Sequence, residues 1–213
     1  MKRSMTLAGL ALCLLIILTG CSETKKLTSE QIDEVNAAFE QLLPAGAGDV
    51  VYMSSAAGEF TLNPITHFFT SYYDSPAQMD MGRFVYYMPR ETFLTSSADE
   101  KELAALAEAY PQLDVESILS TAPFGRIPFA IVNQYLQTYM NVTLEDMSNM
   151  GAALYLNEYE TFYSAASDFG PGNFICTDGE IEGDTVTLYS KYAVLTLKKD
   201  GEKYYIISHV AKT

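Results

Sequence analysis

The spacing of apolar residues changes once along this chain, from a helical period to a strand-like alternation. Residues 28–43, 97–110 and 128–139 carry apolar side chains three or four positions apart. This spacing places them on one face of an α-helix. From residue 173 onward apolar and polar residues alternate, which is typical of strands with one buried face. The pattern predicts helices first and strands last.

Local signals mark where several of these elements begin. Thr28 and Gln31 have the spacing of a capping box, in which each side chain binds the other residue's backbone N–H. Residues 49–95 are the hardest to assign, but Asn63-Pro64 and Asp80 are each typical of a helix start there, and Thr143 opens another short helix. The segment 154–163 fits a strand or a helix equally well, and the sequence leaves it open.

The C-terminal alternation is divided by two turn signals, Glu182-Gly183-Asp184 and Asp200-Gly201. An Asp-Gly pair between alternating segments is among the strongest short-range hairpin signals. The predicted strands are Phe174–Ile181, Thr185–Tyr189, Lys191–Lys199 and Lys203–Val210. Helices followed by an antiparallel meander of about four strands predict an α+β fold, with the helices of the N-terminal two-thirds packed on the C-terminal sheet.

Residues 1–20 have the composition of an export signal. A basic start precedes the apolar run 5–18, which is shorter than the roughly 20 residues that span a bilayer. The run ends in Leu-Thr-Gly-Cys at 18–21, which resembles the lipobox of bacterial lipoproteins. The resemblance implies cleavage between Gly20 and Cys21 and attachment of lipid to the Cys21 thiol. It also implies an extracytoplasmic protein anchored to the bacterial cell membrane.

These signals divide the chain into three parts. Residues 1–20 are the lipoprotein signal peptide that is removed, residues 21–27 are the lipidated cysteine and a tether, and residues 28–213 are a single α+β domain. Removal of the signal takes 20 of the 213 residues and leaves 193. That length suits one domain with a sizeable core.

The charge of the chain bears on its partners. The formal net charge is −14, and loss of Lys2 and Arg3 with the signal makes the mature chain near −16. Such acidity opposes binding to nucleic acid or to an anionic membrane surface. We therefore expect no nucleic-acid partner and expect membrane attachment through lipid, for which two acyl chains make a stable anchor.

Cysteine usage agrees with this interpretation. Cys13 leaves with the signal and Cys21 carries the lipid, so Cys176 remains alone and no intramolecular disulfide is expected. Cys176 lies in an apolar, strand-like run whose nearest charge is Asp178. A reactive thiol requires an electropositive neighbour. We interpret Cys176 as a buried structural thiol.

The candidate chemistry is sparse. The chain has fifteen Tyr, eleven Phe, no Trp and two His. It carries no nucleophile elbow and no pattern typical of a metal or phosphate site, so no catalytic residue, metal or cofactor is expected. Tyr side chains line sugar or peptide sites, but they also fill cores. Convergence of segments 67–87 and 155–174 on a cavity would favour a ligand site. The pocket candidates are His67, Tyr72, Tyr155, Tyr159 and His209.

Two further resemblances are weaker. The helices-then-meander order, ending in the stretch 199–207, resembles ketosteroid-isomerase-like (nuclear-transport-factor-like) domains. This implies a curved sheet that wraps a helix and often a pocket. The chain as a whole resembles small uncharacterised lipoproteins of Gram-positive gut bacteria, notably in stretches 68–74 and 167–170, and this resemblance implies no known activity.

Three functions remain open at this point. The leading hypothesis is a lipid-anchored extracytoplasmic lipoprotein with a binding or interaction role at the cell envelope. Its partner would be an envelope protein, a glycan or a small ligand. The first alternative is a small-molecule enzyme or ligand carrier that uses a ketosteroid-isomerase-like pocket. The second is an extracytoplasmic sensor domain. The absence of a catalytic motif favours binding over catalysis without deciding it.

Overall fold

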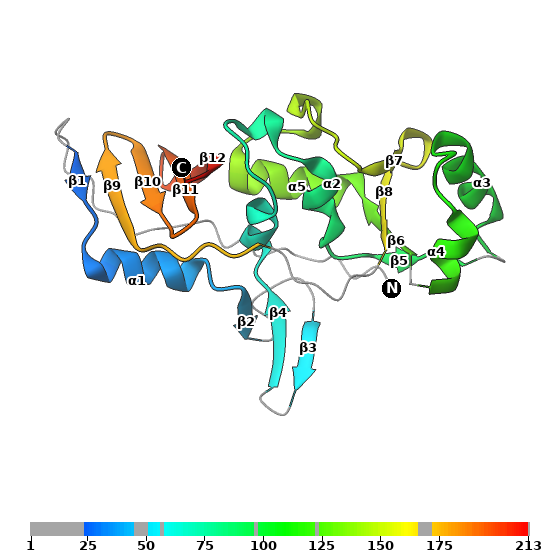
Figure 1. The fold of residues 1–213 in the computed structure, drawn as a ribbon, viewed down its shortest axis with the longest axis horizontal. Coiled ribbons are helices and arrows are strands. Elements are labelled where there is room, and N and C mark those ends of the chain that lie inside the picture. Colours follow the sequence, from blue (N-terminus) through cyan, green and yellow to red (C-terminus); the bar gives the residue numbers. More distant parts are fainter. Residues whose placement is uncertain are drawn as a thin grey trace.

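A computed structural model of the chain describes residues 24–44, 51–55, 58–95, 98–121, 124–165 and 172–212 (Figure 1). The signal segment, the expected cleavage after Gly20 and the expected lipidation of Cys21 lie outside these residues. The described chain has an α+β fold, as the sequence predicts: its helices lie in the first two-thirds and an antiparallel meander closes the chain.

The meander forms most of a five-stranded antiparallel sheet. Its strands are β9 (Asp178–Glu182), β10 (Thr185–Tyr189), β11 (Ala193–Asp200) and β12 (Lys203–Ala211). The fifth strand, β1 (Lys25–Lys26), pairs with β9 and gives the order β1-β9-β10-β11-β12. Four predicted strands are therefore confirmed. Since β1 belongs to the segment predicted as a tether, the folded part of the chain begins earlier than the sequence predicts.

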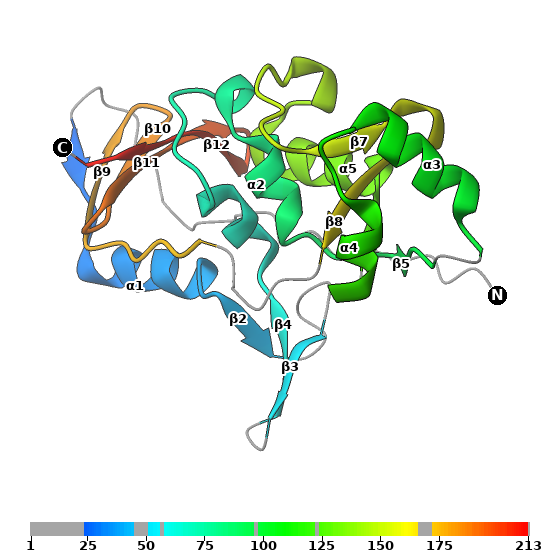
Figure 2. The same cartoon turned by 45° about the vertical axis from the view of Figure 1, so that its right-hand side comes forward.

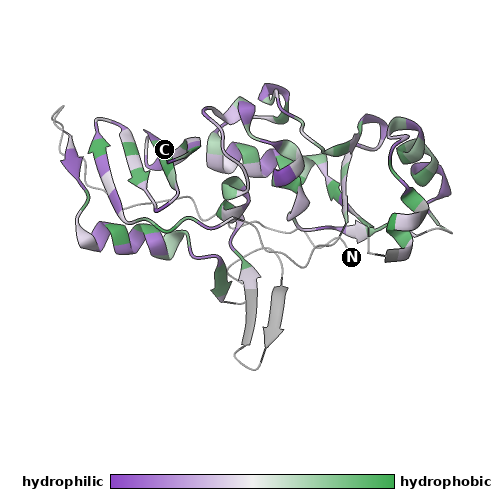
Figure 3. Cartoon of the chain, in the orientation of Figure 1, coloured by the Kyte–Doolittle hydropathy of each residue, from purple (hydrophilic) through white to green (hydrophobic). Residues whose placement is uncertain are grey.

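The alternation of apolar and polar residues decides which face of this sheet is buried (Figure 3). The inward residues include Val186, Leu188, Leu195 and Leu197, and none of them is exposed. The two hairpin turns contain glycines at positive φ, +61° at Gly183 and +62° at Gly201. Other residues adopt this conformation only with strain, so glycine is the favoured residue at both turn positions.

The first strand of the meander begins later than the sequence predicts. The expected strand started at Phe174, but the ladder starts at Asp178. The Asn36 side chain binds the backbone of Cys176 on both sides, accepting from its N–H at 2.7 Å and donating to its carbonyl at 3.0 Å. The backbone groups that a neighbouring strand would use are thus held by a helix residue.

Two helices, α1 (Ser29–Ala38) and α5 (Phe129–Met140), pack with this sheet in the main hydrophobic cluster. The predicted capping box of Thr28 and Gln31 is present. The first predicted helix continued to residue 43, but α1 ends at Ala38. The buried Asn63 amide donates to the carbonyls of Ala38 and Glu40, both at 2.9 Å. These bonds satisfy carbonyls that a longer helix would have used.

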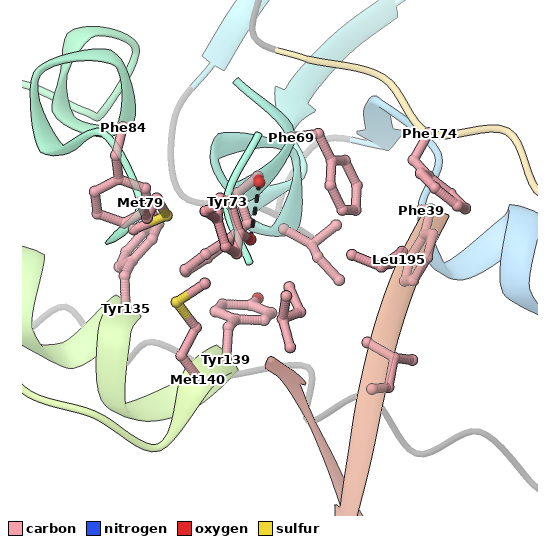
Figure 4. Packing of buried hydrophobic residues seen from close by; sticks show 14 of the residues in the cluster. Phe39, Phe69, Tyr73, Met79, Phe84, Tyr135, Tyr139, Met140, Phe174 and Leu195 are labelled. Carbon is pink, nitrogen blue, oxygen red and sulfur yellow. Dashed lines mark hydrogen bonds between the residues drawn. The ribbon is translucent and has the colours of Figure 1, made fainter. Parts of the chain in front are cut away.

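A short 3₁₀ segment, Pro64–Phe69, lies at the centre of this cluster, and all six of its residues are buried. Figure 4 shows Phe69 of this segment between Tyr139 of α5 on one side and the rings of Phe39 and Phe174 on the other. The Phe68 ring lies 4.9 Å from Phe84 and 5.2 Å from Tyr139. The Phe69 ring lies 5.4 Å from Phe39. The segment therefore joins the helical and sheet parts of the core.

The sequence did not predict two smaller antiparallel sheets. One has the order β2-β4-β3 and the other β5-β6-β8-β7. Strands β7 and β8 occupy the segment 154–163 that the sequence left open. The bounds are β2 (Leu42–Pro44), β3 (Val51–Ser55), β4 (Gly58–Leu62), β5 (Thr92–Phe93), β6 (Phe124–Pro128), β7 (Leu154–Leu156) and β8 (Thr161–Ala165).

The remaining helices are short. They are α2 (Met81–Tyr86), α3 (Glu100–Ala109), α4 (Val115–Thr121) and the 3₁₀ segments Pro76–Gln78, Leu144–Asp146 and Asn157–Tyr159. Asp80 caps α2 and Thr143 caps the segment 144–146, as predicted. Residues of α3 and α4 pack with the four-stranded sheet in a second hydrophobic cluster. Within the described residues no helix is both long enough and apolar enough to cross a membrane.

The two larger sheets lie at opposite ends of the molecule. Figure 1 shows the five-stranded sheet with α1 at one end of the long axis, and α3 and α4 beside the four-stranded sheet at the other. Helices α2 and α5 lie between these ends. The β3–β4 hairpin projects away from the body in both views (Figures 1 and 2).

Phe68→Ala tests the central role of the 3₁₀ segment. Phe68 is fully buried, so the truncation leaves a cavity, and we expect it to lower the free energy of unfolding by about 3–5 kcal/mol in urea denaturation. Phe93→Ala is the matched control, because that ring is 50% exposed and its loss should cost less than about 1 kcal/mol. Equal losses in the two variants would contradict a core centred on this segment.

Candidate functional site

A cavity of about 490 Å³ lies between α2, α4 and the four-stranded sheet. Its volume falls within the range of small-molecule sites, roughly 300–1,000 Å³. Apolar and aromatic side chains make up most of its lining, and Gly82 and four polar residues complete it. The apolar group is Val85, Tyr86, Tyr87, Ile118, Phe124, Ala152, Ala153, Leu154, Tyr163 and Ala165, and the polar group is Thr70, Asp80, Arg83 and Ser164.

One wall depends on a close approach between α2 and the chain before β7. A Cβ placed on Gly82 would lie 2.7 Å from the backbone nitrogen of Ala152, so only glycine fits there. Asp80 caps α2 by accepting from the Arg83 N–H at 3.1 Å. A Cβ on Gly151 would lie 2.2 Å from the Asp80 carboxylate. The Asp80 carboxylate is thereby held against the backbone at the start of the helix.

The opposite wall is held by Arg90. Its guanidinium donates to the Tyr86 carbonyl at 3.0 Å, to the Ser164 carbonyl at 3.2 Å and to the Ser164 hydroxyl at 3.0 Å. It also donates to the Ala165 carbonyl. A Cβ on Gly125 would lie 2.6 Å from Arg90 Cδ, so the glycine leaves room for this side chain. Arg90 ties the end of α2 to β8.

Arg90 forms this clamp without a carboxylate partner among the described residues. Burial lowers the pKa of its guanidinium, because the charged form loses hydration. Backbone carbonyls replace that hydration, including the carbonyl of Tyr86 at the C-terminal end of α2, where the helix dipole favours a cation. We infer that Arg90 shapes the cavity wall and is not itself part of the lining.

Tyr163 connects the cavity to a network of charged residues. Its ring lines the cavity and stacks on Phe124 at 6.1 Å, while its hydroxyl donates to Glu102 at 2.5 Å. Arg126 of β6 donates to both Glu102 oxygens, at 2.8 and 2.5 Å, and to Asp99 at 2.6 Å. These contacts fix α3 on the sheet behind the cavity.

The network shifts the protonation of its members. Burial raises the pKa of Glu102, but hydrogen bonds from Arg126 and Tyr163 outweigh this effect and leave the pKa lowered. A hydrogen bond from the Thr95 backbone, followed by one from Arg126, lowers the pKa of Asp99. Burial and the bond to Glu102 raise the pKa of Tyr163. At neutral pH both carboxylates are charged and the Tyr163 hydroxyl keeps its proton.

The two histidines that the sequence marks as pocket candidates are core residues. His67 is 1% exposed and lies between the rings of Phe84 and Tyr135, at 6.2 and 5.7 Å. Burial lowers its pKa to about 3, so the ring is neutral at physiological pH. His209 is buried, its Nδ1 lies 2.7 Å from the Ser71 carbonyl oxygen, and burial lowers its pKa.

The structure brings only two of the five candidates together. The half-exposed Tyr72 ring lies 5.1 Å from His209. The partly buried Tyr155 packs on Phe162 at 4.6 Å against the main core, and Tyr159 lines a separate, more polar cavity of about 400 Å³ beside residues 98–102. None of the five lines the 490 Å³ cavity.

The segments 67–87 and 155–174 nevertheless meet at the 490 Å³ cavity, through other residues. Thr70, Tyr86 and Tyr87 come from the first segment, and Tyr163 and Ser164 from the second. Sequence reasoning missed these residues because their juxtaposition depends on pairing between distant strands. The adjacent tyrosines 86 and 87 at the end of a short helix were the available signal.

Other candidate chemistry remains structural. Cys176 is 2% exposed, its thiol lies 3.2 Å from the Asp178 carbonyl, and burial raises its pKa. A buried, protonated thiol is a poor nucleophile, so the interpretation from the sequence is confirmed. Within the described part of the chain, no group of three or more His, Cys, Asp or Glu residues is placed to hold a metal ion.

Comparison with known proteins gives no relative for this arrangement. No protein-family model, no curated protein and no solved structure matches the chain. The resemblances to bacterial lipoproteins and to ketosteroid-isomerase-like domains stay predictions.

Glu102→Gln tests the network behind the cavity. The change leaves Arg126 with Asp99 as its remaining carboxylate, and we expect a loss of about 3 kcal/mol in the free energy of unfolding at pH 7. Lys198→Met is the control. It removes the exposed Asp184–Lys198 ion pair, whose side chains are 55% and 51% exposed, and should cost less than about 1 kcal/mol.

The same variant has a predicted pH signature. A carboxylate whose pKa is lower in the folded than in the unfolded chain stabilises the fold above its unfolded pKa, which is about 4.3 for Glu. This stabilisation is lost as pH falls through the folded pKa. The parent protein should therefore lose more stability than Glu102→Gln between about pH 5 and pH 3. If the free energy of unfolding fell equally with pH in the two proteins, the result would contradict the proposed role of Glu102.

Proposed function

We propose that this protein is a lipid-anchored extracytoplasmic lipoprotein that binds a small, mainly apolar ligand in the 490 Å³ cavity without chemical turnover. The main observation behind the proposal is that two hydroxyl groups of the cavity lining already donate hydrogen bonds within the protein. The Tyr163 hydroxyl donates to Glu102, and the Ser164 hydroxyl lies 3.0 Å from the Tyr86 carbonyl. These groups are already hydrogen-bonded within the protein.

A cavity of this kind recognises its ligand mainly by shape and apolar contact. Ring faces and alkyl groups remain available in the lining, and burying apolar surface contributes about 25 cal/mol per Å². A ligand with many polar groups would lose hydration and find few free partners, which costs binding energy. The fitting ligand is therefore neutral, ring-containing or aliphatic, and small.

The residues of the lining favour binding over catalysis. The titratable groups of the lining are Asp80, Arg83 and three tyrosines. Asp80 serves as a helix cap and the raised pKa of Tyr163 keeps it protonated. General acid–base chemistry requires a group whose pKa lies near the working pH and which reaches the substrate. The raised pKa of Tyr163 does not meet this condition, and the Asp80 carboxylate is occupied as the cap of α2.

The alternative hypotheses receive less support. A ketosteroid-isomerase-like pocket would lie within the curve of the C-terminal sheet. The 490 Å³ cavity instead lies beside the four-stranded sheet, and the C-terminal sheet faces a filled aromatic core. A sensor role remains compatible with ligand binding and would add a membrane partner.

Ala152→Phe tests the cavity as the binding site. Ala152 is exposed and lines the cavity, so the added ring occupies the space without disturbing the core. With the neutral probe N-phenyl-1-naphthylamine, we expect saturable fluorescence enhancement in the parent protein. The variant should bind about tenfold more weakly, equivalent to about 1.4 kcal/mol.

Ala107→Phe is the matched control, because Ala107 is an exposed residue of α3 outside the cavity lining and the same ring there should leave the probe affinity unchanged. The anionic analogue anilinonaphthalene sulfonate should bind the parent protein more weakly than the neutral probe. Equal affinities of Ala152→Phe and Ala107→Phe would argue that the probe binds elsewhere.

Cys21→Ala tests the anchor. The tetrad 18–21 is the observation that motivates it. The substitution should abolish incorporation of radiolabelled fatty acid and release the protein from the membrane fraction. Retention of the variant in that fraction, with an uncleaved signal excluded by N-terminal sequencing, would contradict lipid anchoring.

A further inference from the structure

The N-terminal end of the described chain is tied to the edge of the five-stranded sheet. Lys25 and Lys26 pair with Ile181 and Glu180 of β9. Leu27 is buried, and its N–H donates to the Gly179 carbonyl at 2.8 Å. A Cβ on Gly179 would lie 2.5 Å from Leu27 Cδ1. The glycine thus leaves the space that holds the chain in place.

This attachment limits the reach of the anchor. Four residue steps separate Cys21 from Lys25, and a fully extended chain covers at most about 3.3–3.6 Å per residue. The sheet edge can therefore lie no further than about 14 Å from the lipidated residue. A flexible tether over residues 21–27, as expected from the sequence, would have allowed the protein many orientations on the membrane. The shorter link from Cys21 to Lys25 allows few.

The cavity lies away from that edge. Its lining residues come from α2, α4, β6 and β8, and both views place these elements in the part of the molecule remote from β1 (Figures 1 and 2). We propose that the lipid on Cys21 holds the β1–β9 edge of the sheet against the lipid headgroups, so that the cavity faces away from the bilayer. This inference rests on the lipid anchoring proposed above.

The charges at the edge are compatible with this placement. Lys26 pairs with Asp178 at 3.3 Å and Lys198 with Asp184 at 3.0 Å. The Tyr189 hydroxyl donates to Glu180 at 2.7 Å. Strands β1 and β9 together carry two lysines and three carboxylates, Asp178, Glu180 and Glu182, whereas the chain as a whole carries −14. An anionic lipid surface therefore repels this edge only weakly.

Fluorescence quenching by headgroup nitroxides tests the orientation. The full-length lipidated protein is labelled at Glu182→Cys, an exposed position at the end of β9, or at Ala107→Cys on α3. It is then placed in phosphatidylglycerol vesicles that contain a nitroxide-headgroup lipid. We expect about a twofold loss of fluorescence at position 182, because the label sits within roughly 15 Å of the headgroups. The label at position 107 should keep its intensity.

A linker variant supplies the control. Twelve Gly/Ser residues inserted between Glu23 and Thr24 add an average span of roughly 20 Å and should remove the quenching at position 182. Equal quenching at both positions, or quenching that survives the linker, would overturn the proposed orientation. Vesicle flotation separates this result from loss of the anchor: a protein that does not float with the vesicles contradicts the lipid anchoring itself.

Discussion

The fold depends on one buried aromatic contact region, the 3₁₀ segment Pro64–Phe69. Phe68 packs on α2 and α5, whereas Phe69 packs on Phe39 just after α1, on Phe174 and on His209 of β12. Shortly after it, Tyr73 exchanges both backbone hydrogen bonds with His209, at 2.7 and 2.9 Å. A single stretch of chain thus joins the two ends of the core, and close packing makes each ring position depend on its neighbours.

The cavity inherits its geometry from the same region. The chain leaves the 3₁₀ segment, passes Asp80 and becomes α2, whose last carbonyl binds Arg90. An arginine with no carboxylate partner among the described residues is costly to bury, yet four acceptors from α2 and β8 surround it. Removing Arg90 would leave the Ser164 hydroxyl as the remaining side-chain donor to the Tyr86 and Ala165 carbonyls. The hydrogen bonds of Arg90 therefore define the wall of the cavity as much as apolar packing does.

Most of the correct predictions from the sequence came from short motifs whose residues are close together in the chain. The capping box at Thr28, the cap at Asp80 and the Asp200-Gly201 turn involve residues close in sequence, so their physics can be read without the fold. The pairing of β6 with β8 and the ending of α1 by Asn63 involve residues distant in sequence. The site was missed for the same reason. The sequence analysis chose His67 and Tyr155 by residue type, but His67 lies in the core and Tyr155 packs against it. Tyr163 became part of the cavity only through its place in β8.

Charge and hydrogen bonding together narrow what this protein can bind. The acidic surface repels anions at long range, although salt screens that effect beyond roughly 8–10 Å. Inside the cavity, the Tyr163 and Ser164 hydroxyls already donate hydrogen bonds to Glu102 and to the Tyr86 carbonyl. A polar ligand would therefore form few hydrogen bonds with them. Both effects favour a neutral apolar molecule, which is the kind that water dissolves poorly and that gathers near membranes. In the orientation proposed above, the short anchor holds the protein on the bilayer, and the cavity lies in the part of the molecule remote from it, on the aqueous side where the ligand must be exchanged.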